Sequence, residues 1–146
     1  MKLALAALPI LVGVALTACG GNGGSSGPSL VGSWEWEGSN YSNDTEATPD
    51  DPSKYTLELG DDGSVSVVAD CNRSSGTWES DAGDSATSGS LAIKLGPTTL
   101  AECGPGSLYR QFLRDLDGAA AFELTGEKLR FDIRADVGSM SFGQPS

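Results

Sequence analysis

Alternating apolar and polar residues indicate that most of the chain from Leu30 onward forms short β-strands. Residues 33–37 read Ser-Trp-Glu-Trp-Glu, which places both tryptophans on one face of an extended segment. Residues 55–59 and 64–68 alternate in the same way, and Gly60–Gly63 separates them with Gly and Asp. Two alternating runs joined by such residues predict a β-hairpin.

The same pattern predicts further strands in the rest of the chain. They cover residues 76–79, 90–95, 120–124, 128–133 and 138–142. We expect Gly96 and Pro97 to end the second of these, because both residues interrupt regular structure. Residues 38–53 and 80–89 are rich in Ser, Asp, Gly and Thr and are predicted to be surface loops.

One segment has helical periodicity. Between Ser107 and Leu116, apolar side chains recur at spacings of three and four residues. Ser107 can cap the start of this helix and Gly118 can end it. About eight strands and one helix predict an α+β, mainly β domain: a small curved antiparallel sheet or partly open barrel, with the helix packed on it over one opening.

The first residues have the pattern of an export signal. Lys2 is followed by the uncharged, mostly apolar run Leu3–Leu16, which is shorter than the roughly 20 residues of a transmembrane helix. The run ends in Leu-Thr-Ala-Cys19, which resembles the bacterial lipobox that is cleaved before a lipidated Cys. We therefore predict a lipoprotein signal peptide at residues 1–18 and a lipid anchor on Cys19. An ordinary secretory signal with an incidental Cys is the alternative.

Residues 19–29 are rich in Gly and Ser and are predicted to form a flexible tether with a reach of roughly 17 Å. The folded domain is expected at residues 30–143, and residues 144–146 form a tail. The anchor on Cys19 would place the protein on a membrane of the cell envelope. Gly20 is compatible with the periplasmic side of the outer membrane in a Gram-negative cell.

Lipidation of Cys19 leaves two of the three cysteines, Cys71 and Cys103. An exported compartment is oxidising, so a disulfide between them is expected. In the chain-entropy model this bond would stabilise the fold by about 3.7 kcal/mol. Two free thiols are the alternative.

Composition narrows the possible functions. The chain has no His, which excludes Ser-His and Cys-His catalysis and His-ligated metals. A net charge of −11 argues against nucleic acid as a partner. The charge is uneven, since residues 35–84 hold 13 acidic and two basic side chains. Such a surface attracts cations or a basic partner, or serves only solubility and repulsion from an anionic bilayer.

Several candidate sites have simpler structural explanations. Asp61-Asp62-Gly63 offers oxygen ligands for Ca²⁺, but the spacing of a calcium loop is missing and a hairpin turn explains it. Paired carboxylates could support glycoside hydrolysis, but none of the acidic residues lies in a distinctive sequence motif. Cys71 beside Asn72 could be a thiol nucleophile, but the chain lacks a His base. The chain has three tryptophans, which could form a platform for a ligand or pack in the core, namely Trp34, Trp36 and Trp78. We predict no catalytic residue, metal ligand or cofactor.

Three segments together resemble the META domain family, which includes the HslJ-like (DUF306-type) bacterial lipoproteins. Residues 30–34 are similar to the start L-x-G-x-W, residues 70–78 to G-C-N-x-x-x-G-x-[YW], and residues 98–103 to T-x-M-A-C. Asp70 stands where the family usually has Gly, which puts a tight turn there in question. The motif residues expected to support the structure are Trp34, Asn72, Gly76, Trp78 and Thr98. Next to Cys71, the side chains of Asn72 and Arg73 are expected to pin a turn by hydrogen bonds.

This resemblance implies a β-rich domain in the envelope with no established catalytic residues, linked in the family to heat response and novobiocin resistance. We therefore expect a lipid-anchored, non-enzymatic protein with an interaction or stress-response role, whose partner is an envelope protein or a cationic molecule. The alternative is a binding protein on the periplasmic side that takes a small or peptide ligand at the open end of the sheet. A hydrolase is the least favoured interpretation.

Overall fold

The computed structural model describes residues 29–83 and 85–146 of the chain. The predicted signal peptide, Cys19 and all of the predicted tether except Ser29 lie outside the described residues. Within the described ranges, no helix has the length and apolar character that crossing a membrane requires.

Ten strands form one antiparallel sheet in this part of the chain. They are β1 (Gly32–Tyr41), β2 (Glu46–Ala47), β3 (Tyr55–Leu59), β4 (Ser64–Ala69), β5 (Asn72–Glu79), β6 (Ser88–Ser90), β7 (Ala92–Thr98), β8 (Ala119–Thr125), β9 (Lys128–Ile133) and β10 (Gly138–Gly143). Their order is β6-β8-β9-β10-β1-β3-β4-β5-β7, with β2 paired to β1 beside this path. Short 3₁₀ turns at Pro52–Lys54 and Arg134–Asp136 complete the connections.

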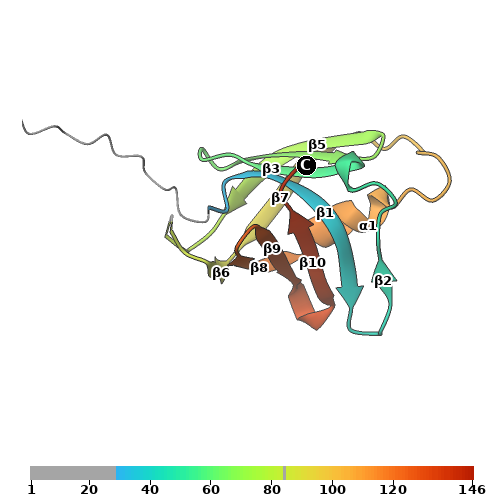
Figure 1. Ribbon diagram of the computed structural model, residues 1–146. Helices are drawn as coiled ribbons and strands as arrows, with labels where there is room; N and C mark the ends of the chain where they lie inside the picture. The colour runs from blue at the N-terminus through green and yellow to red at the C-terminus, as the bar shows by residue number, and fades with distance from the viewer. Residues whose placement is uncertain (1–28, 84) are drawn as a thin grey trace, which may run out of the picture.

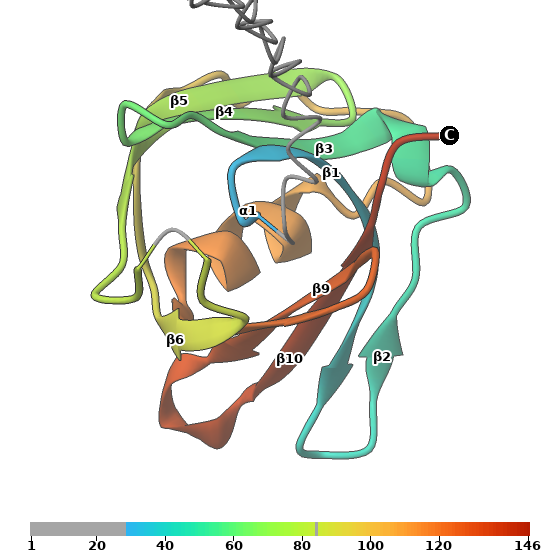
Figure 2. The ribbon, with the colours of Figure 1, turned by 60° about the vertical axis from the view of Figure 1, so that its left-hand side comes forward.

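The sheet curls into a nearly closed barrel because its first and last strands are consecutive in the chain. Only Leu91 separates β6 from β7. β6 pairs with β8, and after Leu91, whose N–H donates to the carbonyl of Ala120 at 2.9 Å, β7 pairs with β5. One continuous segment thus joins both ends of the sheet and leaves a single seam between β7 and β8 (Figures 1 and 2).

Side chains from alternate strand positions fill the barrel with aromatic rings. The Trp36 ring stacks on that of Phe112 with centroids 5.0 Å apart, and Tyr55 meets Phe112 edge-on at 5.7 Å. Phe131 and Phe142 continue the cluster at 4.9 Å. Edge-on and offset ring pairs of this kind add about 0.5–1.5 kcal/mol each beyond the burial of their area. The period-two pattern in the sequence correctly predicted this inward face.

The helix α1 (Tyr109–Asp117) closes one end of the barrel. Its buried face contributes Phe112 to the aromatic cluster, and Figure 2 shows the helix within the ring of strands. The helix starts two residues later than predicted, and Ser107 is not its cap. Instead, the N–H of Leu108 at the N-cap position donates to the hydroxyl of Tyr55 at 2.9 Å. Gly118 ends the helix as predicted.

The prediction of a mainly β domain with one helix is confirmed, and several strand boundaries differ. β5 begins at Asn72 and not at residue 76, and the strand predicted at 90–95 is divided between β6 and β7. The predicted loop at 38–53 contains the second half of β1 and the short strand β2. Gly96 and Pro97 do not end β7, which runs on to Thr98. Here β7 is paired on one side only and shifts register beside Ser74 and Gly76, so the missing N–H of Pro97 breaks no ladder hydrogen bond.

Candidate functional site

The residues of the two cysteine motifs meet beside the helix end of the barrel. The disulfide joins Cys71 to Cys103, with their Cα atoms 5.6 Å apart. Cys71 lies in the two-residue turn between β4 and β5, where Ala69 pairs with Asn72. Asp70 forms that turn with φ at +57°, in the left-handed region that favours Gly. The tight turn therefore exists despite Asp at this position.

Asn72 connects this turn to the loop that carries Cys103. Its side chain is fully buried, and its Oδ1 accepts from the N–H of Ala101 at 2.8 Å and from the hydroxyl of Thr99 at 3.1 Å. Its Nδ2 donates to the carbonyl of Ala101 at 2.9 Å. Three hydrogen bonds from one amide hold the loop beside the disulfide, which is a structural role.

The bonds of Arg73 in the described part of the chain are made by its backbone, so its predicted side-chain bonds are wrong. Its N–H donates to the Thr99 hydroxyl at 2.9 Å, and its carbonyl accepts from the Thr99 N–H at 3.0 Å. The hydroxyls of Ser74 and Thr98 lie 2.7 Å apart. We call this set the motif cluster, and its members are Cys71, Asn72, Arg73, Ser74, Thr98, Thr99 and Cys103.

Gly76 is required where β5 shifts register against β7. A Cβ atom there would lie 2.0 Å from the carbonyl oxygen of Lys94 and 3.0 Å from the Cα of Leu95. Both contacts are with backbone, which cannot swing aside. The motif glycine therefore permits the close approach of two strands.

A second polar cluster, which the sequence did not predict, fastens the helix to β1. The carboxylate of Asp115 is 1% exposed and accepts from the hydroxyls of Ser39 at 2.9 Å and Tyr41 at 2.7 Å. Arg114 donates to the other carboxylate oxygen at 3.1 Å. In the sequence, Asp115 is an acidic residue in a helix next to a basic one, and neither feature marks it as buried.

The Asp115 cluster shifts the ionisation of its neighbours. Burial raises the pKa of the Tyr41 hydroxyl above its ordinary 10.0, and the hydrogen bond and negative charge of Asp115 raise it further. For Arg114, burial lowers the pKa, but the hydrogen bonds and charges of Asp115 and Tyr41 together outweigh it, and the net change in the pKa is upward. Both groups keep their protons at neutral pH. A neutral Tyr41 hydroxyl and a charged Arg114 guanidinium therefore face Asp115 there.

The three tryptophans do not form one platform. Trp34 and Trp36 are 1% and 0% exposed and belong to the core. The Trp34 N–H donates to the carbonyl of Leu30 at 3.0 Å, whereas the buried N–H of Trp36 has no hydrogen-bond partner in the described residues. Trp78 is only partly buried, at the end of the barrel opposite the helix.

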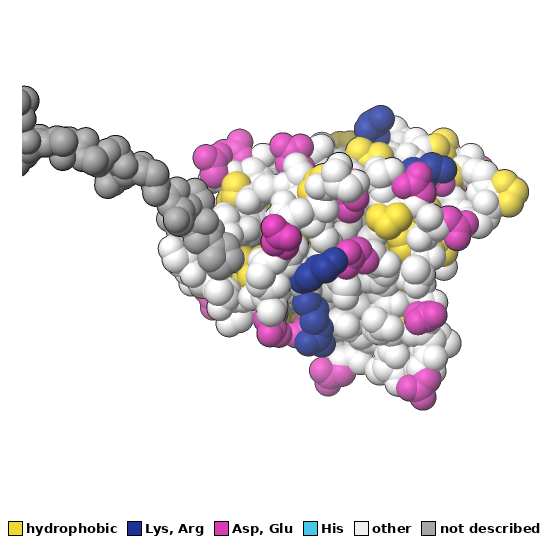
Figure 3. All heavy atoms as spheres, in the orientation of Figure 1, with side chains coloured by type: hydrophobic (Ala, Val, Ile, Leu, Met, Phe, Trp, Pro, Cys, Tyr) yellow, Lys and Arg dark blue, Asp and Glu magenta, His cyan; other side chains and the backbone are white. Residues whose placement is uncertain are grey.

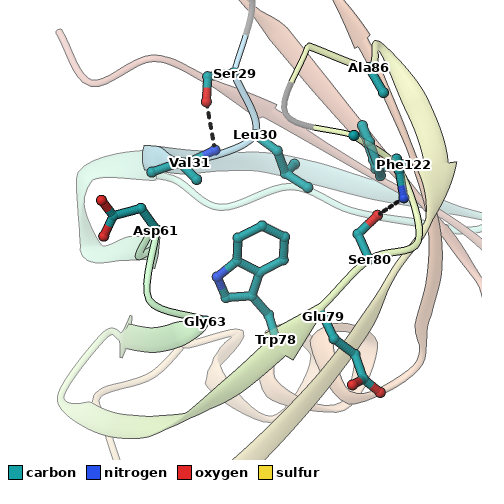
Figure 4. A pocket seen from close by; sticks show the side chains of 12 residues that line it. Ser29, Leu30, Val31, Asp61, Gly63, Trp78, Glu79, Ser80, Ala86 and Phe122 are labelled. Atoms are coloured by element: carbon teal, nitrogen blue, oxygen red, sulfur yellow. Dashed lines mark hydrogen bonds between the residues drawn. The ribbon is translucent and has the colours of Figure 1, made fainter.

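A hollow of about 560 Å³ opens at that end, and Figure 4 shows the Trp78 indole at its centre. The segment before β1, the β3–β4 turn, the end of β5, the following loop and β8 contribute to its wall. We call it the mouth hollow, and its principal residues are Leu30, Val31, Asp61, Trp78, Glu79 and Phe122. The Trp78 N–H donates to the carbonyl of Gly60 at 2.8 Å, so the ring is fixed with its polar atom already paired.

The β3–β4 turn at the edge of the mouth hollow is a hairpin turn. Gly63 takes a φ of +80°, and its N–H donates to the carbonyl of Gly60 at 3.1 Å. The carboxylate of Asp62 accepts from the N–H of Ser64 at 2.9 Å, and hydrogen bonding with Ser64 lowers the pKa of Asp62. Turn geometry accounts for the Asp-Asp-Gly sequence.

Acidic side chains are spread over the face drawn in Figure 3 and do not gather in one patch. Some basic groups are paired with acids, as Lys128 is with Glu37 and Arg130 with Asp132. In residues 29–83 and 85–146, no group of three or more Cys, Asp or Glu side chains is placed to hold a metal ion.

Two solved structures share this fold. A protein from Burkholderia xenovorans, determined by NMR, has a TM-score of 0.60 and 19% identity over 79% of this chain and 82% of that chain. The crystal structure of a DUF4847 family protein from Bacteroides vulgatus ATCC 8482 has a TM-score of 0.58 and 13% identity over 78% and 92%. At these identities the likeness is one of fold alone. No curated protein matches the chain.

The family model of the META domain matches residues 29–144. That range includes every strand, the helix, the motif cluster and the mouth hollow. The motifs quoted from the sequence also fall within it. The chain therefore belongs to the META domain family.

Proposed function

We propose that this protein is held in the cell envelope by lipid on Cys19 and that its META domain acts there by binding and not by catalysis. The anchor is supported by the lipobox-like sequence that ends at Cys19. A role in envelope stress fits the heat-response link of HslJ-like lipoproteins. Without His, the chain would need converging carboxylates or an activated nucleophile for hydrolysis.

One observation carries the binding function, namely the mouth hollow with Trp78 at its centre. Its volume of about 560 Å³ lies within the usual range of small-molecule sites, roughly 300–1,000 Å³. The motif cluster lies at the opposite end of β4 and β5, where its hydrogen bonds are used to hold a loop. The hollow thus favours a small or peptide ligand, which is the more specific form of the interaction role.

The anchor is tested by radiolabelled palmitate incorporation in cells that express the full chain. Wild type should be labelled and should sediment with membranes, whereas Cys19→Ser should lose both properties. Ser25→Ala, in the predicted tether, is the matched control and should behave as wild type. Labelling that persists in Cys19→Ser overturns the anchoring.

The binding role is tested by photo-crosslinking in intact envelopes. A benzoylphenylalanine is placed at Val31, which is 39% exposed in the wall of the hollow, or at the exposed Asp44 in the β1–β2 connection as control. We expect a defined adduct from position 31 that is missing from position 44. Identical patterns from both positions would contradict a ligand site at the hollow.

A further inference from the structure

We infer that the mouth hollow takes a cationic amphiphile, a ligand whose apolar group lies against Trp78 and whose positively charged amine lies at the rim near Asp61. This inference rests on the proposed binding function, and it adds the chemical class of the ligand. Three features of the hollow support it: its floor, its rim and its position in the chain.

The floor is apolar and rigid. Leu30 and Phe122 are 7% and 4% exposed and belong to the core, and both face the hollow with Trp78 (Figure 4). Because the Trp78 N–H is paired with the Gly60 carbonyl, the ring offers its face and edge and no free donor. Small side chains at Ala82 and Ala86 in the loop after β5 keep the space open. An alkyl or aromatic group gains most here, at about 25 cal/mol for each Å² removed from water.

The rim carries negative charge. The charged side chains that line the hollow are Asp61 and Glu79, and neither makes an ion pair within the described part of the chain. Figure 4 shows both carboxylates pointing away from Trp78, which places them at the edge and not in the floor. Asp62 follows Asp61 directly, and Asp81 lies two residues after Glu79. Hydrogen bonds from Ser64 and Ser90 keep the pKa values of Asp62 and Asp81 low.

This arrangement selects by charge. An ammonium at the rim lies near the carboxylate of Asp61, and it can also lie near the π-face of Trp78, which attracts cations. An anionic head on the same alkyl group would meet like charges, and it would approach against a chain whose net charge is −11. Charge complementarity therefore separates a cationic from an anionic amphiphile of the same length.

The position of the hollow favours an amphiphile from a membrane surface. Ser29 and Leu30 line the hollow, and Cys19 precedes Ser29 by ten residues. The Gly- and Ser-rich composition of residues 19–29 predicts a flexible tether, and a tether of that length would keep the domain within roughly 17 Å of the proposed anchor on Cys19. The hollow would then lie close to the bilayer surface, where amphiphilic molecules collect.

The test compares three eight-carbon probes below their micelle concentrations: octyltrimethylammonium, octyl glucoside and octyl sulfate. Binding to the purified full chain is followed by calorimetry and by tryptophan fluorescence. We expect the ammonium to bind at least fivefold more tightly than the glucoside, and the sulfate to bind most weakly. The preference should shrink in 0.5 M NaCl, which screens charges at an exposed rim. Asp61→Asn should weaken ammonium binding about two- to fivefold, and the matched control Asp44→Asn should leave it unchanged.

Two variants test whether the ligand lies in the hollow itself. Trp78→Ala removes the floor, and Ala86→Phe fills the space without removing a hydrogen bond; each should weaken binding of every probe at least fivefold. Equal binding of the three probes with no effect of Asp61→Asn would overturn the charge preference and leave the binding function standing. Ammonium binding that Trp78→Ala and Ala86→Phe both leave unchanged would overturn the site. Absence of binding by all three probes would count against the binding function as well.

Discussion

Replacing Asn72 by Ala tests whether one buried amide holds the two cysteine motifs together. The substitution removes three hydrogen bonds that link Asn72 to Thr99 and Ala101 at 2.8–3.1 Å. It leaves the disulfide between Cys71 and Cys103 in place. Any loss of stability therefore belongs to the amide and not to the covalent link.

The size of the loss follows from the solvent exposure of the partners. Ala101 is exposed, so water can replace part of what its N–H and carbonyl lose. Each bond is then worth its net value of about 1 kcal/mol and not the larger penalty of a buried unpaired group. Three bonds give a loss of about 3 kcal/mol. For a domain of about 115 residues this lowers Tm by about 12 °C.

The assay is thermal unfolding followed by circular dichroism under non-reducing conditions, with Asn40→Ala as the matched control. Asn40 is an exposed residue of β1, and the described residues give its side chain no hydrogen bond. Its replacement should change Tm by less than 3 °C. Asn72→Asp is a third arm, since the carboxylate keeps the acceptor but cannot donate to the Ala101 carbonyl. It should be at least as destabilised as Asn72→Ala at pH 7.

A Tm for Asn72→Ala within 3 °C of wild type would refute this reasoning. The loop at 99–103 would then be held by the disulfide alone. A large loss in Asn72→Ala together with a wild-type Tm for Asn72→Asp would also contradict it, because the donated bond would then contribute nothing.

Three further predictions follow from single backbone or side-chain features. Gly76→Ala should lower the free energy of unfolding in urea by at least about 2 kcal/mol, because its Cβ would lie 2.0 Å from a carbonyl oxygen of β7. The control Gly104→Ala, which has open space around the Cβ, should lower it by less than about 0.5 kcal/mol. Equal losses in the two variants would contradict the steric argument. Asp70→Gly should raise Tm, since it relieves a φ of +57° worth about 1 kcal/mol, and an unchanged or lower Tm would count against strain at this turn. In alkaline titration followed at 295 nm, Tyr41→Phe should remove a component that ionises above the ordinary pKa of 10.0. If Tyr41→Phe instead removes a component that ionises at the ordinary pKa of 10.0, the burial of Tyr41 is contradicted. The stability that Tyr41 contributes to the fold is present at neutral pH and falls as the pH rises through its raised pKa.

The alternation of side chains was sufficient to predict most strands, because inward and outward positions have strongly different composition here. Lys128–Ile133 has the predicted bounds, with Leu129, Phe131 and Ile133 buried. The second half of β1 was missed because Gly38, Ser39 and Asn40 are small or polar and do not alternate with apolar residues. It is held by pairing with β10 across a bulge at Gly38, a long-range contact that no local pattern contains. The end of β7 was missed for the same reason, since its pairing on one side tolerates Pro97.

The motif cluster includes Cys71, Asn72, Thr98 and Cys103, which were singled out in the sequence from the expected disulfide and from the resemblance to META domains. The Asp115 cluster was not predicted, since a buried carboxylate on a helix looks like an exposed one until Ser39 and Tyr41 are known to face it. The helix start was misplaced because a tertiary donor–acceptor pair, Leu108 with Tyr55, replaces the local cap that Ser107 could have given.

The open end of the sheet was expected from the sequence as an alternative ligand site, but the residues that line the mouth hollow could not be predicted, because five separate segments build it. Leu30 and Trp78 are residues of the family motifs that also line the hollow, and Trp78 has a further role. Its indole N–H supports the β3–β4 turn through Gly60, while its ring remains partly exposed. Fold and binding are therefore coupled through one side chain. Trp78→Phe separates the two roles, because it keeps an aromatic floor but removes the N–H. If this variant loses stability and still prefers octyltrimethylammonium, the hydrogen bond serves the fold and the ring serves the ligand.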